Sequence, residues 1–409
     1  MNASEIVDVE IRACRGADEL NQLDAVSAVQ LPGGNRPDFT VITLTTADGT
    51  TGTSFGFGAL DAVAAAHVMS QVKPFFIGRD AFHTQAHLKD FEMFDRKWNL
   101  TPIYAYGPFD NACWDIVGKQ SGQPVYRLLG AAKTEIPLYV SSMFLPGPDE
   151  YVEQALEVKG RGIKGYKLHP PGDPKIDIEC YRAVREAVGD DFTLMADPVI
   201  SYNYEQALVV GRELEKLGYR WLEEPLLDVN FHGLRKLREK LDLPICGTEV
   251  LAGGHYSTAH YIHEGIADIV RTDVSWRGGI TSVMKTGHMA ESFGVQCELH
   301  TTIYQALEQV QIHASLALPN SEFFEMLYPF DDFAFGTKST VVVEDGMVQA
   351  PQGEGLGIDY DWDFIDNQTH HTVSIARTGA ERSTRRPVVV SKICRASCGI
   401  MTPISVPSS

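Results

Sequence analysis

Four acidic residues and one histidine recur at nearly even intervals through the middle of the chain, each at the carboxyl end of a short apolar run. They are Asp197, Glu223, Glu249, Asp273 and His300. The steps between them are 26, 26, 24 and 27 residues (from 197 to 223, 249, 273 and 300). A strand with its crossover helix occupies about this length. These residue types at this spacing predict a site where carboxylates bind a cation and an imidazole moves a proton.

In a parallel barrel, the carboxyl ends of consecutive strands converge on one rim. Asp197, Glu223 and Glu249 would then meet in one cup, and three carboxylates suit a hard divalent cation such as Mg²⁺. Zinc would prefer nitrogen or sulfur ligands, which these positions lack. Because a single acid is more often a helix cap or a loop charge, the prediction depends on the three together.

From about residue 134 the chain alternates between short apolar runs and amphipathic stretches, a pattern typical of strands alternating with helices. Eight parallel strands with right-handed helical crossovers close into a barrel. A doubly wound open sheet is the alternative, but no GxGxxG sequence follows an early strand. The predicted strands are IPLYVSS, GYKLH, TLMADPV, RWLEEP, LPICGTE, ADIVRTD, GVQCELH and EFFEML.

The rest of the chain predicts a second, α+β domain. Two alternating runs near the N-terminus indicate strands, and three helical patterns follow before residue 130. Asp345 and Gly346 form a hairpin signal, and we expect this antiparallel segment to pack on the N-terminal domain. The predicted division is a capping domain over 1–130, completed by about 335–369, a barrel over 131–334 and a basic tail over 370–409.

The tail differs from the rest of the chain in composition. Six basic residues face one acid there (6 − 1 = +5), whereas the whole chain has a net charge of −19. Apolar periodicity also disappears, so we expect a poorly ordered tail, or one foreign to the fold, rather than a nucleic-acid arm. The charged residues are Arg377, Glu381, Arg382, Arg385, Arg386, Lys392 and Arg395.

Charge and composition argue against several function classes. The net charge of −19 disfavours nucleic acid and anionic membranes as partners, because both would be repelled. No stretch reaches the roughly 18 apolar residues of a membrane span, and the N-terminus lacks a basic region followed by an apolar core. A cytoplasmic location is therefore expected. Seven cysteines without CxxC spacing favour buried reduced thiols.

The ordered set of motifs resembles the enolase superfamily, mandelate racemase subgroup, over about residues 5–365. The resemblance implies a modified (β/α)₇β barrel with an α+β capping domain, one essential Mg²⁺ and abstraction of the proton α to a substrate carboxylate. It also implies a homo-oligomer, from dimer to octamer. The motifs are KLH at 167–169, Asp197, LEEP around Glu223, Glu249, DVSWRGGIT at 273–281 and ELH at 298–300.

The resemblance assigns roles to single residues. Asp197, Glu223 and Glu249 match the metal-ligand positions. A proton α to a carboxylate is hardly acidic, and a cation on that carboxylate stabilises the charge that grows in the transition state. Strand alternation points the adjacent Glu224 away from the cup. We expect Glu224 to contact the metal-binding carboxylates and not the metal itself.

His300 is the main candidate for proton transfer, because an imidazole titrates near neutral pH. Asp273 and His300 match the family's Asp-His pair, in which the carboxylate hydrogen-bonds the second ring nitrogen. Glu325 matches an acidic position on the eighth strand that contacts the substrate, and Glu322 is the alternative for it.

The second barrel strand departs from the family. Many members carry Lys-x-Lys there, whereas this chain has Lys167, Leu168 and His169. Alternation places Lys167 and His169 on one face. His169 is either the base or a neutral hydrogen-bond donor to a substrate hydroxyl. Lys167 is either the base or a positive charge near the substrate carboxylate.

The leading hypothesis is a Mg²⁺-dependent acid-sugar (aldonate or aldarate) dehydratase that yields a 2-keto-3-deoxy acid. His169 or Lys167 takes the α-proton, and His300 protonates the departing 3-hydroxyl. Dehydration is preferred because much of the resembling subgroup performs it. One alternative is a racemase or epimerase of a 2-hydroxy acid. An alternative of another class is a non-catalytic Mg²⁺-stabilised barrel that binds acid sugars, since KLH could mark a lost base.

Two glycine-rich loops of the capping domain are candidate lids over the site. The first spans 32–39 and the second 49–59. They offer Asn35, Arg36, Ser54 and Phe55 as candidate substrate contacts.

Overall fold

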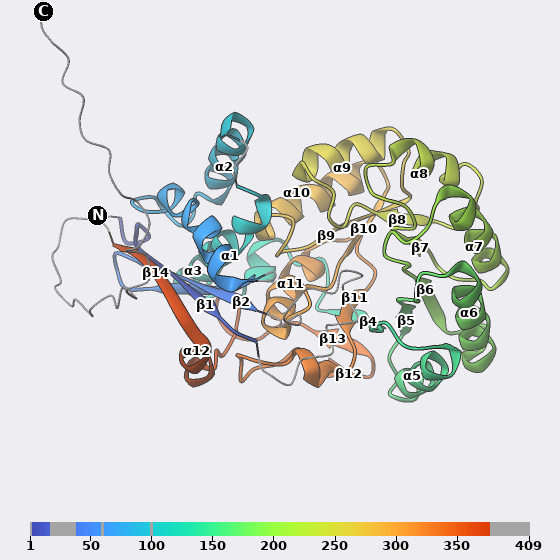
Figure 1. The fold of residues 1–409 in the computed structure, drawn as a ribbon. Coiled ribbons are helices and arrows are strands. Elements are labelled where there is room, and N and C mark those ends of the chain that lie inside the picture. The colour runs from blue at the N-terminus through green and yellow to red at the C-terminus, as the bar shows by residue number, and fades with distance from the viewer. Residues whose placement is uncertain (1, 17–37, 59–60, 99–100, 377–409) are drawn as a thin grey trace, which may run out of the picture. The chain divides into compact units, whose positions relative to one another are not determined.

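Two sheets organise the chain. The computed structural model describes residues 2–16, 38–58, 61–98 and 101–376. The smaller sheet is antiparallel and belongs to the capping domain, and the larger sheet is mainly parallel and forms a barrel (Figure 1). In spatial order, the smaller sheet consists of β14 (Thr369–Ala376), β1 (Ile6–Cys14), β2 (Phe39–Thr46) and β3 (Thr51–Phe57). The α-helices between β3 and the first barrel strand are α1 (Ala62–Ser70), α2 (Thr84–Trp98), α3 (Gly107–Ser121) and the short α4 (Val125–Leu128).

The eight predicted barrel strands are all present. They are β4 (Glu135–Ser141), β5 (Gly165–Leu168), β6 (Thr193–Ala196), β7 (Leu222–Glu223), β8 (Ile245–Gly247), β9 (Ile269–Thr272), β10 (Gln296–Leu299) and β11 (Phe324–Leu327). Neighbouring strands pair in parallel from β4 to β10, and β11 closes the ring by pairing with β4 and contacting β10.

A helix follows every barrel strand except the last, which makes the (β/α)₇β arrangement directly visible in the element order. In Figure 1 these helices surround the ring of strands. Within the described ranges, none of the helices is long and apolar enough to cross a bilayer. The barrel helices are α5 (Pro148–Gly160), α6 (Pro174–Val188), α7 (Tyr204–Lys216), α8 (Phe231–Arg238), α9 (Gly254–His263), α10 (Gly279–Ser292) and α11 (Gln305–Ala317).

Helix α6 illustrates why the sequence forms these crossovers. Asp173 caps its first turn by accepting a hydrogen bond from Lys175 N (2.9 Å), and Pro174 suits the first helical position. Gly189 ends it with a φ of 79°. Val184 and Val188 lie one turn apart and are buried against the barrel, each stabilising the fold by about 1.5 to 3 kcal/mol.

The predicted hairpin is present, but its predicted packing is wrong. Asp345 (φ 49°) and Gly346 (φ 73°) form the turn between β12 (Val343–Glu344) and β13 (Met347–Gln349). Strand β13 pairs antiparallel with β4 and so extends the barrel sheet rather than the capping domain. The reason is apolar burial, because Val348 is inserted in the barrel core.

Other residues of the predicted 335–369 segment do pack on the capping domain. Phe335, Tyr360 and Ile365 form one buried cluster with Phe39 and Phe55. Phe39 and Phe55 stack with ring centroids 4.8 Å apart. The cluster includes Phe335 and Tyr360 before α12 (Trp362–Gln368) and Ile365 within it, so this part of the chain returns to the first domain.

The predicted start of the tail at residue 370 is wrong. Strand β14 pairs antiparallel with β1 along most of its length. Val373 packs against the core of the capping domain, and exposure alternates along the strand. Only Val373, Ile375 and Ala376 are apolar among its eight residues, so the strand pattern is weak next to a basic segment. The remaining predicted tail, residues 377–409, lies outside the described residues.

The capping domain holds the first turn of a barrel helix. Asp110 in α3 accepts a hydrogen bond from Thr281 N (2.8 Å), and Asn111 accepts one from Ile280 N (3.1 Å). Asn111 also donates to Val274 O (3.1 Å). These contacts satisfy amide groups that the start of α10 leaves free. Burial raises the pKa of Asp110 to about 7.

Truncation after Thr369 should destabilise the protein relative to truncation after Ala376, because only the shorter chain loses β14. The ladder hydrogen bonds and the packing of Val373 together contribute about 2 kcal/mol or more. Urea denaturation of the two truncated proteins measures the difference. Equal midpoints would contradict the assignment of β14 to the sheet.

Asp110→Asn should become progressively more stable than the parent protein as the pH rises from about 4 to 7. In the unfolded chain this carboxyl ionises near pH 4, whereas burial keeps it protonated in the folded chain up to about pH 7. Ionisation therefore costs folding free energy across that window. Urea midpoints at pH 4.5 and 8 test this. The exposed Asp191→Asn serves as control, and a gap that fails to widen refutes the expectation.

Candidate active site

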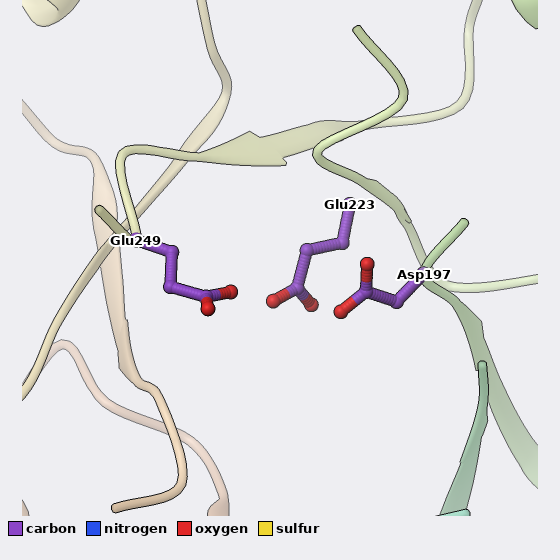
Figure 2. A group of neighbouring side chains, drawn as sticks. All are labelled: Asp197, Glu223 and Glu249. Carbon is purple, nitrogen blue, oxygen red and sulfur yellow. The ribbon is translucent and has the colours of Figure 1, made fainter. Parts of the chain in front are cut away.

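Three carboxylates meet at the carboxyl ends of the barrel strands. Asp197 follows β6, Glu223 ends β7 and Glu249 follows β8. One oxygen from each lies within 4.8 Å of the others (Figure 2). Among the described residues, no other group of three or more acidic, histidine or cysteine side chains is arranged to hold a metal ion. The structure therefore brings the three predicted ligands together in what we call the carboxylate cup.

The electrostatics of the cup fit a divalent cation. Burial, followed by the charges of Asp197 and Glu223, raises the pKa of Glu249 well above its ordinary value. Burial also raises the pKa of Glu223. Three adjacent carboxylates resist simultaneous ionisation unless a cation balances them, and oxygen ligands are those that Mg²⁺ prefers. These residues would hold such an ion.

Lys167 lies beneath the cup and is fully buried. Its Nζ lies 3.0 Å from Asp197 Oδ2, 3.1 Å from Glu223 Oε2 and 2.8 Å from Glu325 Oε1. Burial opposes the charge, but the three carboxylates raise the pKa of Lys167 well above its ordinary value. Lys167 is therefore held as an ammonium, which fits an anchoring cation and not a base.

Arg271 in β9 is a second buried cation, which sequence reasoning missed. Its Nε lies 3.0 Å from Glu223 Oε1 and its Nη1 lies 3.2 Å from Glu223 Oε2. It also pairs with Glu325 and donates to Tyr139 Oη (3.1 Å). The sequence did contain a signal for placing Arg271 at the site. Side chains alternate along a strand, so Arg271 lies on the same face as Asp273, two residues later.

Glu325 joins the two cations. It accepts hydrogen bonds from Ser141 Oγ (2.6 Å) and Thr301 N (3.0 Å) in addition to its ion pairs. Although burial opposes ionisation, Lys167 and Arg271 keep the pKa of Glu325 well below its usual range. Both of its oxygens are thus occupied by protein donors. The alternative residue, Glu322, is exposed and pairs with Arg220 outside the cup.

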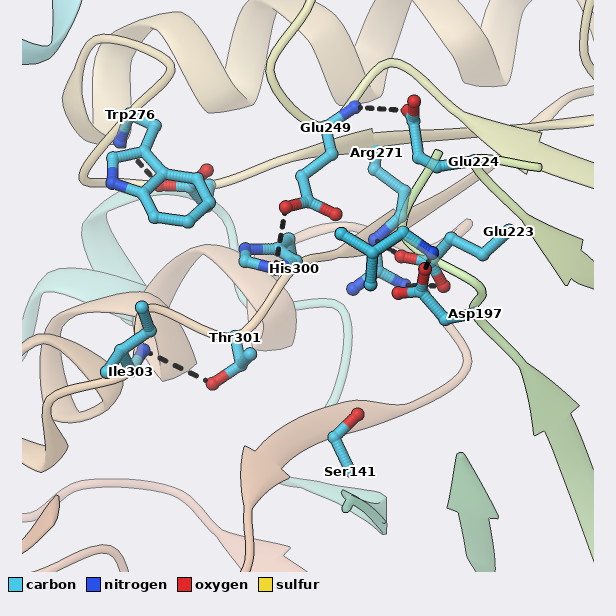
Figure 3. Close-up of polar contacts among 12 residues, drawn as sticks. Ser141, Asp197, Glu223, Glu224, Glu249, Arg271, Trp276, His300, Thr301 and Ile303 are labelled. Carbon is cyan, nitrogen blue, oxygen red and sulfur yellow. Dashed lines mark hydrogen bonds and ion pairs between the residues drawn. The ribbon is translucent and has the colours of Figure 1, made fainter. Parts of the chain in front are cut away.

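Glu224 makes the contact expected of it. Its Oε1 accepts a hydrogen bond from the backbone N of Glu249 (3.1 Å) (Figure 3). Burial raises the pKa of Glu224 to about 8. It therefore orients Glu249 from outside the cup without adding another charge at neutral pH.

Two histidines flank the cup from different strands. His169 Nδ1 lies 2.6 Å from Ser142 O, and its Nε2 lies 3.1 Å from Asp197 Oδ2. His300 Nε2 lies 3.1 Å from Glu249 Oε1. Both ring nitrogens of His169 thus face acceptors. For His300, burial lowers the pKa well below its ordinary value and keeps the ring neutral.

The predicted hydrogen bond between Asp273 and His300 is absent. Asp273 Oδ1 instead accepts from Ser275 N (2.7 Å), Ser275 Oγ (2.6 Å) and Trp276 N (2.6 Å). Asp273 Oδ2 and His300 Nδ1 are both buried without a partner among the described residues. The local turn captures the aspartate, because its backbone amides lie within two or three residues.

Trp276 orients His300 in place of the aspartate. The two rings stack with centroids 5.0 Å apart at 26° (Figure 3). Phe57, at the end of β3, meets the edge of Trp276 at 5.4 Å and so links the capping domain to the site. Trp276 lies within the DVSWRGGIT motif, but its residue type alone does not indicate a stack.

The loop residues proposed from sequence do not contribute described contacts to the site. Asn35 and Arg36 lie outside the described residues. Ser54 and Phe55 are fully buried in β3, and Phe55 belongs to the aromatic cluster of the capping domain. The prediction that they contact substrate is wrong, because the second glycine-rich loop is mostly a strand.

Comparisons with known proteins agree with this architecture. Residues 29–130 match the N-terminal domain of mandelate racemase/muconate lactonizing enzyme, and residues 150–364 match the enolase C-terminal domain-like family. An arabinonate dehydratase of Saccharolobus solfataricus is 31% identical over 320 residues, which cover 75% of this chain and 83% of the relative. An N-succinyl-L-Arg/Lys racemase of Bacillus cereus is 28% identical over 231 residues, 56% of this chain and 61% of the relative.

A solved structure gives the same result for the fold. The crystal structure of D-glucarate dehydratase from Agrobacterium tumefaciens, complexed with magnesium, is similar with a TM-score of 0.80 and 32% identity. The match covers 90% of this chain and all of the other (100%). The family matches, the barrel with its capping domain and the three carboxylates lead to one conclusion: this chain belongs to the mandelate racemase/muconate lactonizing enzyme family of the enolase superfamily.

Proposed function

We propose that the protein is a Mg²⁺-dependent acid-sugar dehydratase that yields a 2-keto-3-deoxy acid. The observation that carries the proposal is a carboxylate cup flanked by two histidines from different strands. The dehydratase relatives support the substrate class. Asp197, Glu223 and Glu249 would hold Mg²⁺, which when bound stabilises the negative charge that develops on the substrate carboxylate.

His300 is proposed to take the α-proton through Nε2. This nitrogen points toward the cup, and the burial that lowers the pKa of His300 leaves the ring neutral and able to accept a proton. Lys167 is a poorer base because three carboxylates hold its charge.

His169 is proposed to give the proton that lets the 3-hydroxyl leave as water. Its Nδ1 lies 2.6 Å from Ser142 O, and its Nε2 faces the cup, 3.1 Å from Asp197 Oδ2. Loss of the α-proton and of water leaves an enol, which becomes the 2-keto-3-deoxy acid. The order of the two histidines is thus the reverse of the order expected from sequence, because the contacts differ on the two sides.

Racemisation or epimerisation of a 2-hydroxy acid is the second candidate, favoured by the racemase relative and by histidines on two sides of the cup. Incubation in D₂O with a library of acid sugars and 2-hydroxy acids separates the two. An epimerase returns deuterated starting material, whereas a dehydratase accumulates a 2-keto acid that reacts with semicarbazide. A binding protein without activity would show neither, yet its melting temperature would rise with ligand and Mg²⁺ present.

Asp197→Asn, Glu223→Gln and Glu249→Gln should each weaken Mg²⁺ binding and abolish turnover, because each removes a ligand charge. Isothermal titration of the metal-free proteins measures the affinity, and circular dichroism checks the fold. The exposed Glu239→Gln is the matched control. Parental Mg²⁺ affinity in all three variants would refute the metal site.

His300→Asn and His169→Asn should each lower turnover by about 10² to 10⁴-fold, but with different exchange behaviour. His300→Asn should also lose exchange of the α-proton with D₂O, because the base is missing. His169→Asn should keep exchange while failing to expel the hydroxyl. NMR of the recovered substrate reports the exchange, and the exposed His263→Asn is the control. If His169→Asn loses α-proton exchange and His300→Asn keeps it, then His169 is the base and His300 is the acid.

A further inference from the structure

The two oxygens of the Glu223 carboxylate have different surroundings. Oε2 accepts hydrogen bonds from Trp221 Nε1 (3.0 Å) and Arg271 Nη1 (3.2 Å), and it lies 3.1 Å from Lys167 Nζ. Oε1 lies 3.0 Å from Arg271 Nε but accepts no hydrogen bond from the described residues. A carboxylate oxygen offers about two lone pairs. The two hydrogen bonds therefore use both lone pairs of Oε2, and the Lys167 charge beside it further disfavours a cation there. Oε1 keeps free lone pairs for a cation.

The donors around Oε2 are fixed in place. Trp221 lies two residues before Glu223, so alternation puts both side chains on one face, and its indole is fully buried. The Arg271 guanidinium is held further by Tyr139 Oη and Glu325. Neither donor can follow Glu223 if the carboxylate rotates, so rotation would leave buried N–H groups unpaired at a cost of about 1 to 3 kcal/mol each.

Asp197 shows a similar division between its oxygens. Its Oδ2 faces Lys167 Nζ (3.0 Å) and His169 Nε2 (3.1 Å). Its Oδ1 accepts one hydrogen bond, from Val199 N (3.0 Å). Protein donors therefore favour binding through a single oxygen at two of the three carboxylates, and most strongly at Glu223.

We propose that Trp221 and Arg271 are positioning residues that restrict Glu223 to one-oxygen binding and thereby select Mg²⁺ over Ca²⁺. Mg²⁺ needs an octahedron of about six ligands, whereas Ca²⁺ takes about six to eight oxygens and often binds both oxygens of one carboxylate. A Glu223 whose second oxygen accepts two hydrogen bonds and lies beside the Lys167 ammonium cannot supply that extra ligand. This inference rests on the metal site of the proposed function, but not on the substrate or the reaction.

Trp221→Phe tests the inference, because phenylalanine keeps an aromatic ring at this position and removes the N–H donor together with part of the indole. Metal-free protein is titrated with MgCl₂ and with CaCl₂ by isothermal calorimetry. Loss of a contact that orients a metal ligand usually changes metal affinity by about 10 to 100-fold. Because only Ca²⁺ can use the second oxygen of Glu223, the Kd for Ca²⁺ divided by the Kd for Mg²⁺ should fall by about 10-fold in the variant. Trp114→Phe is the matched control, because its indole donates to Thr281 Oγ1 at the contact between α3 and α10.

Arg271→Met gives a second, larger perturbation, and its control is Arg185→Met. Arg185 is also buried, but it donates to backbone carbonyls outside the cup. The Ca²⁺/Mg²⁺ ratio should fall in Arg271→Met and stay unchanged in Arg185→Met. Circular dichroism checks both folds, and if Arg271→Met fails to fold then Trp221→Phe alone decides.

The outcomes separate this inference from the proposed function. If the parent protein binds neither ion, the metal site itself is wrong. If the parent binds Mg²⁺ and Trp221→Phe keeps the parental ratio within about 2-fold, well below the usual effect, the selectivity inference is overturned and the metal site stands. A lower ratio in Trp221→Phe supports the inference whatever substrate the enzyme turns over.

Discussion

The balance of buried charge at the carboxyl end of the barrel is the constraint on which the site depends. Four carboxylates and two cationic side chains lie next to one another there, and all six are buried or nearly so. With every group ionised the sum is −2, which one divalent cation neutralises. Unpaired charges of this kind would be costly in the interior. The groups are Asp197, Glu223, Glu249 and Glu325, with Lys167 and Arg271, and Glu249 alone is partly exposed.

This balance of charge also explains why three neighbouring glutamates, Glu223, Glu224 and Glu325, have different roles. Glu325 has both oxygens bonded to the cations and to nearby donors, so it anchors them. Glu223 keeps one oxygen free, and Glu224 is kept from adding charge by a raised pKa. Environment, not residue type, divides these roles, because burial and donors decide which carboxyl ionises.

The capping domain reaches the site through packing. Asp110 and Asn111 fix the start of α10, and Asn111 also holds the carbonyl of Val274, one residue after Asp273. Phe57 touches Trp276, which stacks on His300. The orientation of an imidazole in the barrel thus depends on residues of another domain. Phe57, more than 200 residues before Trp276 in the chain (57 against 276), supports the orientation of this imidazole through Trp276.

The sequence by itself determined the barrel and the carboxylate cup. Strand-helix units of similar length place Asp197, Glu223 and Glu249 at equivalent strand ends, so their spacing predicts their meeting. Only the tertiary structure decided that Arg271 lies beneath them, that Asp273 turns to its own loop and that β14 completes the first sheet. These outcomes depend on which donors lie nearest in space. Periodicity encodes the face of an element, whereas pairing between distant segments is set by competition among contacts that have no repeat in the sequence.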